Sequence, residues 1–274
     1  MTDLNYAAPA PAGGGNFSLD VSGVEPIPFT RLVRLELRKM VDTRAGLWLM
    51  ISTALICLAV VVIALLVGWR THSQLSFDNF MFAVSIPMSI FLPVLGIMAV
   101  TAEFTQRTAL VSFTQTPSRM RLIWAKFAAS VCVALVAVAL GMVIAAASAI
   151  VSGWIAGDPT EWGFRSGQIL GYFLGDLLAM ATGFAFGTLF INTAVSIVLY
   201  FVYIFVLPPI FGLAMMLEWF RKLSPWIDFN SAQLPLLQWQ MSGSDWAHLA
   251  VSGSIWLLLP LVLGMWRVSR AEIK

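Results

Sequence analysis

Long apolar runs separated by short polar segments dominate the sequence. A helix needs about 20 mostly apolar residues to cross the hydrocarbon of a bilayer. Six runs of about that length occur, at residues 46–68, 79–102, 125–152, 168–190, 193–217 and 247–266. The pattern therefore predicts an all-α polytopic membrane protein with six transmembrane helices.

A shorter amphipathic segment, residues 29–44, precedes the first run. Apolar side chains recur at the i, i+3, i+4 spacing of one helical face: Phe29, Leu32, Val33, Leu37, Met40 and Val41. Arg31, Arg34 and Arg38 share another face. A basic amphipathic helix beside a membrane span usually lies in the interface plane, with its cations among lipid phosphates. We therefore expect an interfacial helix, which either anchors to lipid alone or also contacts a partner or the polar segment around Glu103.

Composition agrees with this class, since 59% of the residues are hydrophobic and 11% are charged. The formal net charge of +2 is too small to indicate nucleic-acid binding. If both termini are cytosolic, the outer loops keep Arg70, Arg165, Arg221 and Lys222, and the other twelve of the 16 cations lie inside. For six spans, the positive-inside rule thus favours cytosolic termini in a cell membrane.

The first 28 residues include the run APAPAGGG and lack an apolar stretch behind a basic start. We expect residues 1–28 to form a disordered cytosolic tail and not a signal peptide. The membrane domain is then expected over residues 45–270.

The polar segment 103–124 separates the second and third runs. With Lys126 just beyond it, the segment carries cations that face no matching cluster of acids: Arg107, Arg119, Arg121 and Lys126. Thr116 and Pro117 suit the N-cap and first position of the helix that follows. Glu103 is expected to form an ion pair with the basic helix 29–44. The segment is either an ordinary cytosolic loop or a docking loop for a cytosolic partner.

Small residues recur every four positions in the fourth run: Gly167, Gly171, Gly175, Ala179, Gly183 and Gly187. Such a ridge matters in lipid because small side chains let two helix backbones approach closely. The ridge serves either packing within the chain or a moving interface.

Asp176 lies beside this ridge and is the only acid predicted well inside a run. An acid within a membrane is costly and is by default a candidate for function. Alternatively, Asp176 lies nearer the bundle surface, or pairs with Thr182 or a backbone group.

Residues 208–245 are too apolar for a free loop and too interrupted to span a membrane. Prolines break the segment and tryptophans suit the headgroup level: Pro208, Pro209, Pro225, Pro235, Trp219, Trp226, Trp239 and Trp246. We expect short re-entrant helices on the outer side, or alternatively an apolar extracellular cap.

The motifs of several enzyme classes are absent from the sequence. No GxxxxGK[ST] phosphate loop, HExxH or GxSxG pattern occurs. His72 and His248 lie at predicted span ends or outer loops without a cysteine cluster, so no metal site is expected. We therefore expect a non-catalytic chain with no cofactor of its own.

These features together resemble the permease subunits of type-2 ABC transporters, which have the type V exporter fold. The resemblance covers about residues 29–270. The family has a loose E…GT…P-x-R…K pattern. The matching residues in this sequence are Glu103, Thr108, Pro117, Arg119 and Lys126, and Arg107 stands where the family often has glycine.

The resemblance implies that residues 29–44 are the connecting helix and that residues 106–115 approximate a coupling helix held by a separate ATP-binding subunit. The coupling residues would be Arg107, Thr108, Pro117, Arg119, Arg121 and Lys126. Two permease copies and two ATP-binding subunits would form the working unit, with ATP and Mg²⁺ bound by the latter. A hydrophobic or amphipathic drug, lipid or peptide would be exported through a cavity between the two permease copies, expected along the second and fifth spans, beneath the outer helices as a lid.

Two other functions stay open. A proton-coupled secondary carrier would use Asp176 and would work without ATP. A non-transporting scaffold or immunity protein would need the amphipathic helix and the polar loop only as docking surfaces.

Overall fold

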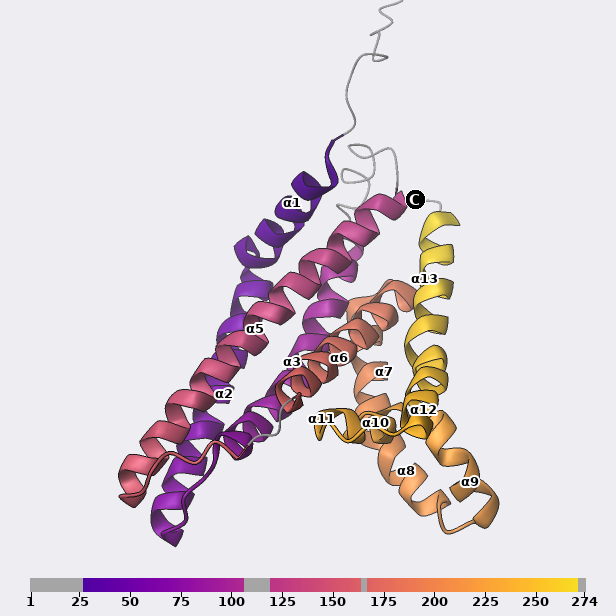
Figure 1. Ribbon diagram of the computed structural model, residues 1–274. Coiled ribbons are helices and arrows are strands. Elements are labelled where there is room, and N and C mark those ends of the chain that lie inside the picture. Colours follow the sequence, from indigo (N-terminus) through magenta and orange to yellow (C-terminus); the bar gives the residue numbers. More distant parts are fainter. Residues whose placement is uncertain (1–26, 106–118, 164–166, 271–274) are drawn as a thin grey trace, which may run out of the picture.

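The computed structural model describes residues 27–105, 119–163 and 167–270. Within these ranges every regular element is a helix (Figure 1). Six helical segments are long and apolar enough to cross a membrane: Arg44–Thr71, Phe77–Phe104, Arg119–Ala156, Gln168–Phe190, Thr193–Ala214 and Gly243–Arg270. The predicted all-α architecture with six spans is therefore confirmed.

The first four spans are single helices, namely α2 (Arg44–Thr71), α3 (Phe77–Thr105), α5 (Arg119–Ala156) and α6 (Gln168–Phe190). The last two spans each contain a π-helical turn. The fifth consists of α7 (Thr193–Phe201), η1 (Val202–Val206) and α8 (Leu207–Ala214). The sixth consists of α12 (Gly243–Gly253), η2 (Ser254–Leu258) and α13 (Leu259–Arg270). Three short helices lie between them: α9 (Glu218–Ile227), α10 (Phe229–Ala232) and α11 (Leu234–Leu237).

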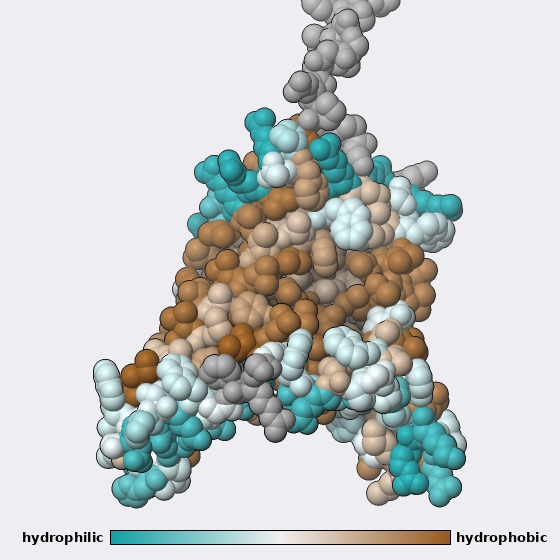
Figure 2. Space-filling view, viewed as in Figure 1, coloured by the Kyte–Doolittle hydropathy of each residue, from teal (hydrophilic) through white to brown (hydrophobic). Residues whose placement is uncertain are grey.

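The bundle has two distinct ends (Figure 1). Helix α1 (Phe29–Asp42) and the C-terminal end of α13 lie at one end, called the α1 end below. Helices α9, α10 and α11 lie at the opposite end, called the α9 end. Figure 2 shows a hydrophobic belt between them, with hydrophilic residues gathered at both ends. This distribution suits a protein that crosses an apolar layer.

Helices α3 and α6 form the centre of the bundle. In an apolar stretch of 18 residues, 56% of each of these two helices is buried inside the protein, whereas the corresponding share of α2 is 11%. Phe80 and Val84 of α3 belong to the same buried cluster as Met180 and Phe184 of α6. The outer helix α2 therefore presents most of its apolar surface to the surroundings, and the α3–α6 pair positions the polar residues described below.

A one-residue elbow connects α1 to α2. Thr43 has extended backbone, and its hydroxyl accepts a hydrogen bond from the backbone N–H of Gly46 at 3.3 Å, which caps the start of α2. A side chain at Gly46 would collide with the carbonyl oxygen of Met40. This close approach explains the glycine, and the elbow ends α1 at Asp42, two residues before the predicted end of the amphipathic helix.

The fifth span extends into the segment that was predicted as outer helices from residue 208. Pro208 and Pro209 come directly after the π turn η1, and the helix continues through them without a break. The span therefore continues to Ala214, and the separate short helices begin at Glu218.

Candidate functional site

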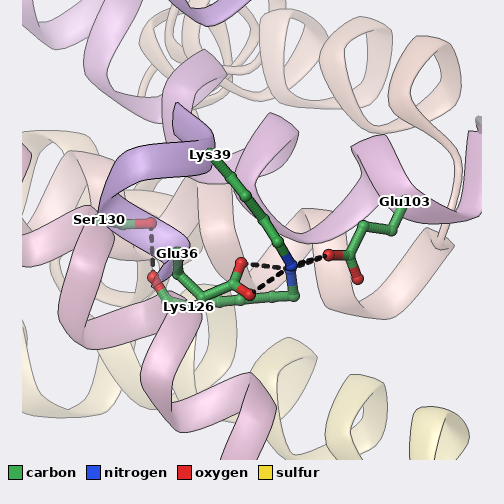
Figure 3. Close-up of polar contacts among 5 residues, drawn as sticks. All are labelled: Glu36, Lys39, Glu103, Lys126 and Ser130. Carbon is green, nitrogen blue, oxygen red and sulfur yellow. Dashed lines mark hydrogen bonds and ion pairs between the residues drawn. The ribbon is translucent and has the colours of Figure 1, made fainter. Parts of the chain in front are cut away.

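Four charged side chains meet at the α1 end, where α1, α3 and α5 come together (Figure 3). Lys126 of α5 donates a hydrogen bond to Glu36 of α1 at 2.7 Å and lies 3.0 Å from the carboxylate of Glu103 on α3. Lys39 of α1 donates to the same two carboxylates at 2.8 Å each. We call these four residues the ion-pair cluster.

The ion-pair cluster contains two cations and two anions and is largely shielded from solvent. The side chains of Lys126 and Glu36 are 6% exposed, that of Glu103 is 12% exposed and that of Lys39 is 47% exposed. Burial lowers the pKa of Lys39, but its hydrogen bonds with Glu103 and Glu36 outweigh that effect and raise the pKa above its ordinary value. Lys39 therefore stays charged at neutral pH and balances the cluster.

The ion-pair cluster fixes α1 against the ends of two spans. Removing one partner of a buried ion pair leaves an uncompensated charge in a medium of low dielectric constant, so such a cluster holds its members firmly in place. Helices α3 and α5 are the two spans joined by residues 106–118. The cluster thus lies at the base of the segment that was predicted to dock a partner.

Part of the predicted coupling segment lies outside the described residues, including residues 106–115 and three named side chains: Arg107, Thr108 and Pro117. Arg119 and Arg121 are half-buried in the first turn of α5. Lys126 was grouped with these cations but points into the ion-pair cluster. Its ammonium group is therefore engaged with Glu36 and Glu103 and is not presented at the surface.

The predicted ion pair between Glu103 and the basic helix is confirmed, with Lys39 as the partner. Glu36 was not predicted, although the sequence carried a signal. It interrupts the apolar face of α1 between Leu32 and Met40, and an acid on a buried face needs a partner.

The three arginines of α1 are exposed and lie away from this cluster: Arg31, Arg34 and Arg38. Arg38 forms an ion pair with Asp42 at 3.0 Å, but both side chains are more than half exposed. An exposed pair of this kind contributes at most about 1 kcal/mol. These arginines are therefore available for contacts outside the chain.

The ridge of small residues on α6 meets different neighbours along its length. A side chain at Gly171 would collide with the carbonyl oxygen of Leu236 on α11. At the other end of the ridge, a side chain at Gly183 would collide with Pro93 of α3, and one at Gly187 would lie 3.1 Å from Ile97 of α3. The ridge thus permits close backbone contacts within the chain at both of its ends.

A cavity of about 340 Å³ opens along the middle of this ridge, between α3, α6, the fifth span and α10. We call it the Asp176 cavity. Its walls combine apolar side chains such as Phe82, Ile86 and Phe205 with polar ones: Ser85, Ser89, Asp176, Thr182, Tyr200, Tyr203, Asn230 and Gln233. It lies along the second and fifth spans, the two spans named for the predicted substrate pathway, but it is formed within one chain, whereas that pathway was predicted between two permease copies.

Asp176 is 5% exposed and borders this cavity. Among the described residues it has no hydrogen-bond or ion-pair partner. The pairing with Thr182 that the sequence left open does not form, because the Thr182 hydroxyl donates to the carbonyl of Leu178 at 2.7 Å. The carboxylate of Asp176 is therefore a buried acceptor available to the cavity.

Tyr200 links the fifth span to the second at the wall of the Asp176 cavity. Pro93 has no N–H to donate to the carbonyl of Ser89, four residues earlier in α3. The hydroxyl of Tyr200 donates to that carbonyl instead, at 3.4 Å. A proline in the second span thus creates an acceptor that holds the fifth span.

The two π turns hold the short helices of the α9 end. Asn230 of α10 donates to the carbonyl of Tyr203 in η1 at 3.5 Å, and Trp256 in η2 donates its indole N–H to the carbonyl of Ile227 at 2.7 Å. The rings of Tyr203 and Trp256 also pack together, with centroids 4.8 Å apart. Tyr203 also lines the Asp176 cavity, and its hydroxyl is buried without a partner among the described residues. Because π turns often occur at functional sites, this combination marks the cavity as a candidate binding site.

Another cavity, of about 330 Å³, borders the ion-pair cluster between α1, α2 and α3. Methionines line much of it: Met40, Met50 and Met98. All four charged groups at its rim pair with one another, so this cavity, unlike the Asp176 cavity, has no described charged side chain left for a ligand.

Comparison with known proteins gives one family match. A family model described as "ABC-2 family transporter protein" matches residues 32–207, from the first turn of α1 to the start of α8. No curated protein matches the chain.

Proposed function

The chain belongs to the ABC-2 transporter family as a membrane-spanning permease subunit, and we propose that it exports a hydrophobic or amphipathic molecule using ATP hydrolysed on separate subunits. The observation that carries this proposal is the Asp176 cavity, which lies between the second and fifth spans and is partly polar and partly apolar. A cavity of this size, with a few polar groups among apolar walls, is typical of small-molecule sites. Drugs, lipids and short peptides are the substrate classes that such walls would accept.

The orientation that follows from this proposal places the α1 end in the cytosol and the α9 end outside the cell. The exposed arginines of α1 would then lie near the phosphates of the inner leaflet. The α9, α10 and α11 helices would cover the outer side of the Asp176 cavity as a lid.

The partners in this proposal are two ATP-binding subunits and a second permease copy or paralogue. ATP and Mg²⁺ would be bound by the ATP-binding subunits, so this chain would need no cofactor and no catalytic side chain. The segment 106–115 would dock on the partner, with Arg119 and Arg121 beside it. The ion-pair cluster supports this assignment, because Glu103, before that segment, and Lys126, after it, both pair with residues of α1. In this arrangement Lys126 positions the docking segment and does not touch the partner.

Charge reversal tests the docking role. Arg119→Glu with Arg121→Glu should release the ATP-binding subunits, or abolish substrate-stimulated ATP hydrolysis, while the permease still inserts into the membrane. The control is Arg270→Glu, which reverses an exposed arginine at the same end of the bundle, outside the docking segment. Co-purification and ATPase activity in reconstituted vesicles are the measurements. If the double variant binds the ATP-binding subunits and supports substrate-stimulated ATP hydrolysis as the wild type does, the basic segment serves only to set the membrane topology.

A proton-coupled carrier is a second candidate function, favoured by the unpartnered carboxylate of Asp176. Such a carrier must protonate and deprotonate that group in each cycle, which an amide cannot do. Asp176→Asn should therefore retain ATP-dependent transport of neutral substrates in an exporter. Transport driven by a pH gradient without ATP, and lost in this variant, would establish the carrier instead.

A further inference from the structure

We propose that the Asp176 cavity recognises organic cations, with the positive charge held at Asp176 and the apolar body held by aromatic side chains. The role of this site in transport rests on the proposed function, whereas binding itself does not. The inference depends on three observations: an acid without a partner, an aromatic wall and the absence of any cationic side chain from the described residues of the cavity lining.

The first observation is the isolation of Asp176. A carboxylate in apolar surroundings is stable only when a hydrogen-bond donor or an opposite charge compensates it. The acids of the ion-pair cluster meet this condition, since Glu36 and Glu103 are each held by two lysines. Asp176 is equally buried but has no such partner among the described residues. A bound cation would supply the missing charge.

The second observation is the aromatic wall of the cavity. Phe82, Tyr200, Tyr203 and Phe205 line it from α3 and from the fifth span. The face of an aromatic ring attracts cations, and the attraction increases when the cation is desolvated. The wall therefore suits organic cations that carry apolar groups around the charge.

The third observation is the charge of the lining. The described residues that line the cavity include no lysine, arginine or histidine, so Asp176 is the one described lining residue that can become charged near neutral pH. An anionic ligand would bring a second negative charge next to Asp176 and would find no compensation. The cavity should therefore bind cations more tightly than anions of the same size and shape.

The volume limits the size of the ligand. About 340 Å³ lies near the lower end of the range of small-molecule pockets, roughly 300–1,000 Å³. A compact cation with several rings fits this space, whereas a folded peptide would not. Tetraphenylphosphonium and tetraphenylborate form a suitable pair of probes, because they have similar size and shape and opposite charge.

Equilibrium dialysis of the full chain in nanodiscs of zwitterionic lipid tests the proposal, with empty nanodiscs correcting for partition into lipid. Tetraphenylphosphonium should bind the wild type at least ten times more tightly than it binds Asp176→Asn. Asp158→Asn removes the charge of an exposed acid outside the cavity and should leave binding unchanged. Asp176→Glu, which keeps the charge, should bind closer to the wild type than Asp176→Asn does. Equal binding of the phosphonium to the wild type and to Asp176→Asn would overturn the proposal, as would tighter binding of the borate to the wild type.

A protection experiment keeps the proposal testable if Asp176→Asn does not fold. Ser85 is half-buried at the cavity wall, and Ser85→Cys places a thiol there while leaving Asp176 intact. Tetraphenylphosphonium should slow alkylation of this thiol severalfold, and tetraphenylborate should not. The native Cys132 is exposed on α5, away from the cavity lining, and serves as the internal reference. No protection, or equal protection by both ions, would refute cation recognition.

These assays need no ATP-binding subunit, so their outcome is separate from the proposed function. Charge-selective binding without substrate-stimulated ATP hydrolysis would support the site and contradict the exporter. Normal ATP-driven transport with binding that ignores charge would support the exporter and contradict the cation site.

Discussion

Replacing Lys126 with methionine removes one of the two cations of the ion-pair cluster and keeps a side chain of similar length. Glu36 and Glu103, at 6% and 12% exposure, would then share Lys39 alone. The cluster changes from balanced to singly negative in a site that is mostly closed to water. We therefore expect a large loss of stability from this one substitution.

The structure allows the size of this loss to be judged. Removing one partner of a buried ion pair costs about 3–5 kcal/mol. The cost at Lys126 should be near the lower value, because Lys39 remains 2.8 Å from both carboxylates and is itself 47% exposed. At roughly 2–4 °C per kcal/mol, a loss of about 3 kcal/mol lowers the apparent melting temperature by about 6–12 °C.

Thermal unfolding of the purified permease in one detergent measures this shift. The matched control is Lys222→Met, which makes the same change at an exposed position of α9. Surface substitutions of that kind usually change the unfolding free energy by at most about 0.5 kcal/mol. The control should therefore melt within a degree or two of the wild type.

A double variant separates the ion pair from simple packing. Glu36→Gln with Lys126→Met removes one charge of each sign and leaves Lys39 paired with Glu103. Its loss of stability should be smaller than the two single losses added together, by about 1–3 kcal/mol, because interacting sites couple on that scale. The reasoning is refuted if the two single losses add within about 0.5 kcal/mol, or if Lys126→Met melts like the Lys222→Met control.

Two further predictions concern the packing of the bundle and the α9 end. Gly183→Ala should lower the melting temperature, because its new Cβ would meet the carbonyl of Pro93. Gly212→Ala should be neutral or stabilising, since the space around Gly212 is open and alanine favours a helix over glycine by about 1 kcal/mol. Equal shifts of the melting temperature in the two variants would contradict the close approach at Gly183. Trp256→Phe removes the indole N–H that donates to the carbonyl of Ile227 at 2.7 Å and leaves that partly buried carbonyl unpaired, which should cost about 1 kcal/mol. Hydrogen exchange should then increase in the α9 helix, and unchanged exchange there would show that the indole bond does not hold it.

The spans could be predicted from the sequence because the bilayer fixes both their length and their apolar character. The two π turns could not, since an apolar segment has the same hydropathy whether its hydrogen bonds close α-helical or π-helical rings. The fifth span was predicted over 193–217 and ends at Ala214, but residues from 208 onward were also assigned to the outer helices, because Pro208 and Pro209 suggested a break that the helix does not have.

The contacts of the charged residues could also be predicted only in part. Glu103 was matched to the basic helix because few other cations were close to it in the expected topology. The full ion-pair cluster joins Glu36 to Lys126, which are 90 positions apart in the sequence. Such a contact depends on how α1 lies across α5, and no periodicity within either helix specifies that angle. Asp176 was identified as unusual for a membrane span, but its lack of a partner is a property of the folded cavity.

The π turn η1 alters the geometry of the fifth span beyond its own five residues. In this turn the N–H of Leu207 bonds to the carbonyl of Val202, five positions earlier, so the ring holds one residue more than an α-helical ring. One residue corresponds to about 100° around a helix axis. The residues that follow are therefore rotated by about that amount compared with an uninterrupted α-helix of the same sequence. Deletion of a single residue within 202–206 would therefore close this turn as an α-helical one and leave Pro208 facing the cavity, whereas the unshortened segment wound as an α-helix would turn Pro208 away.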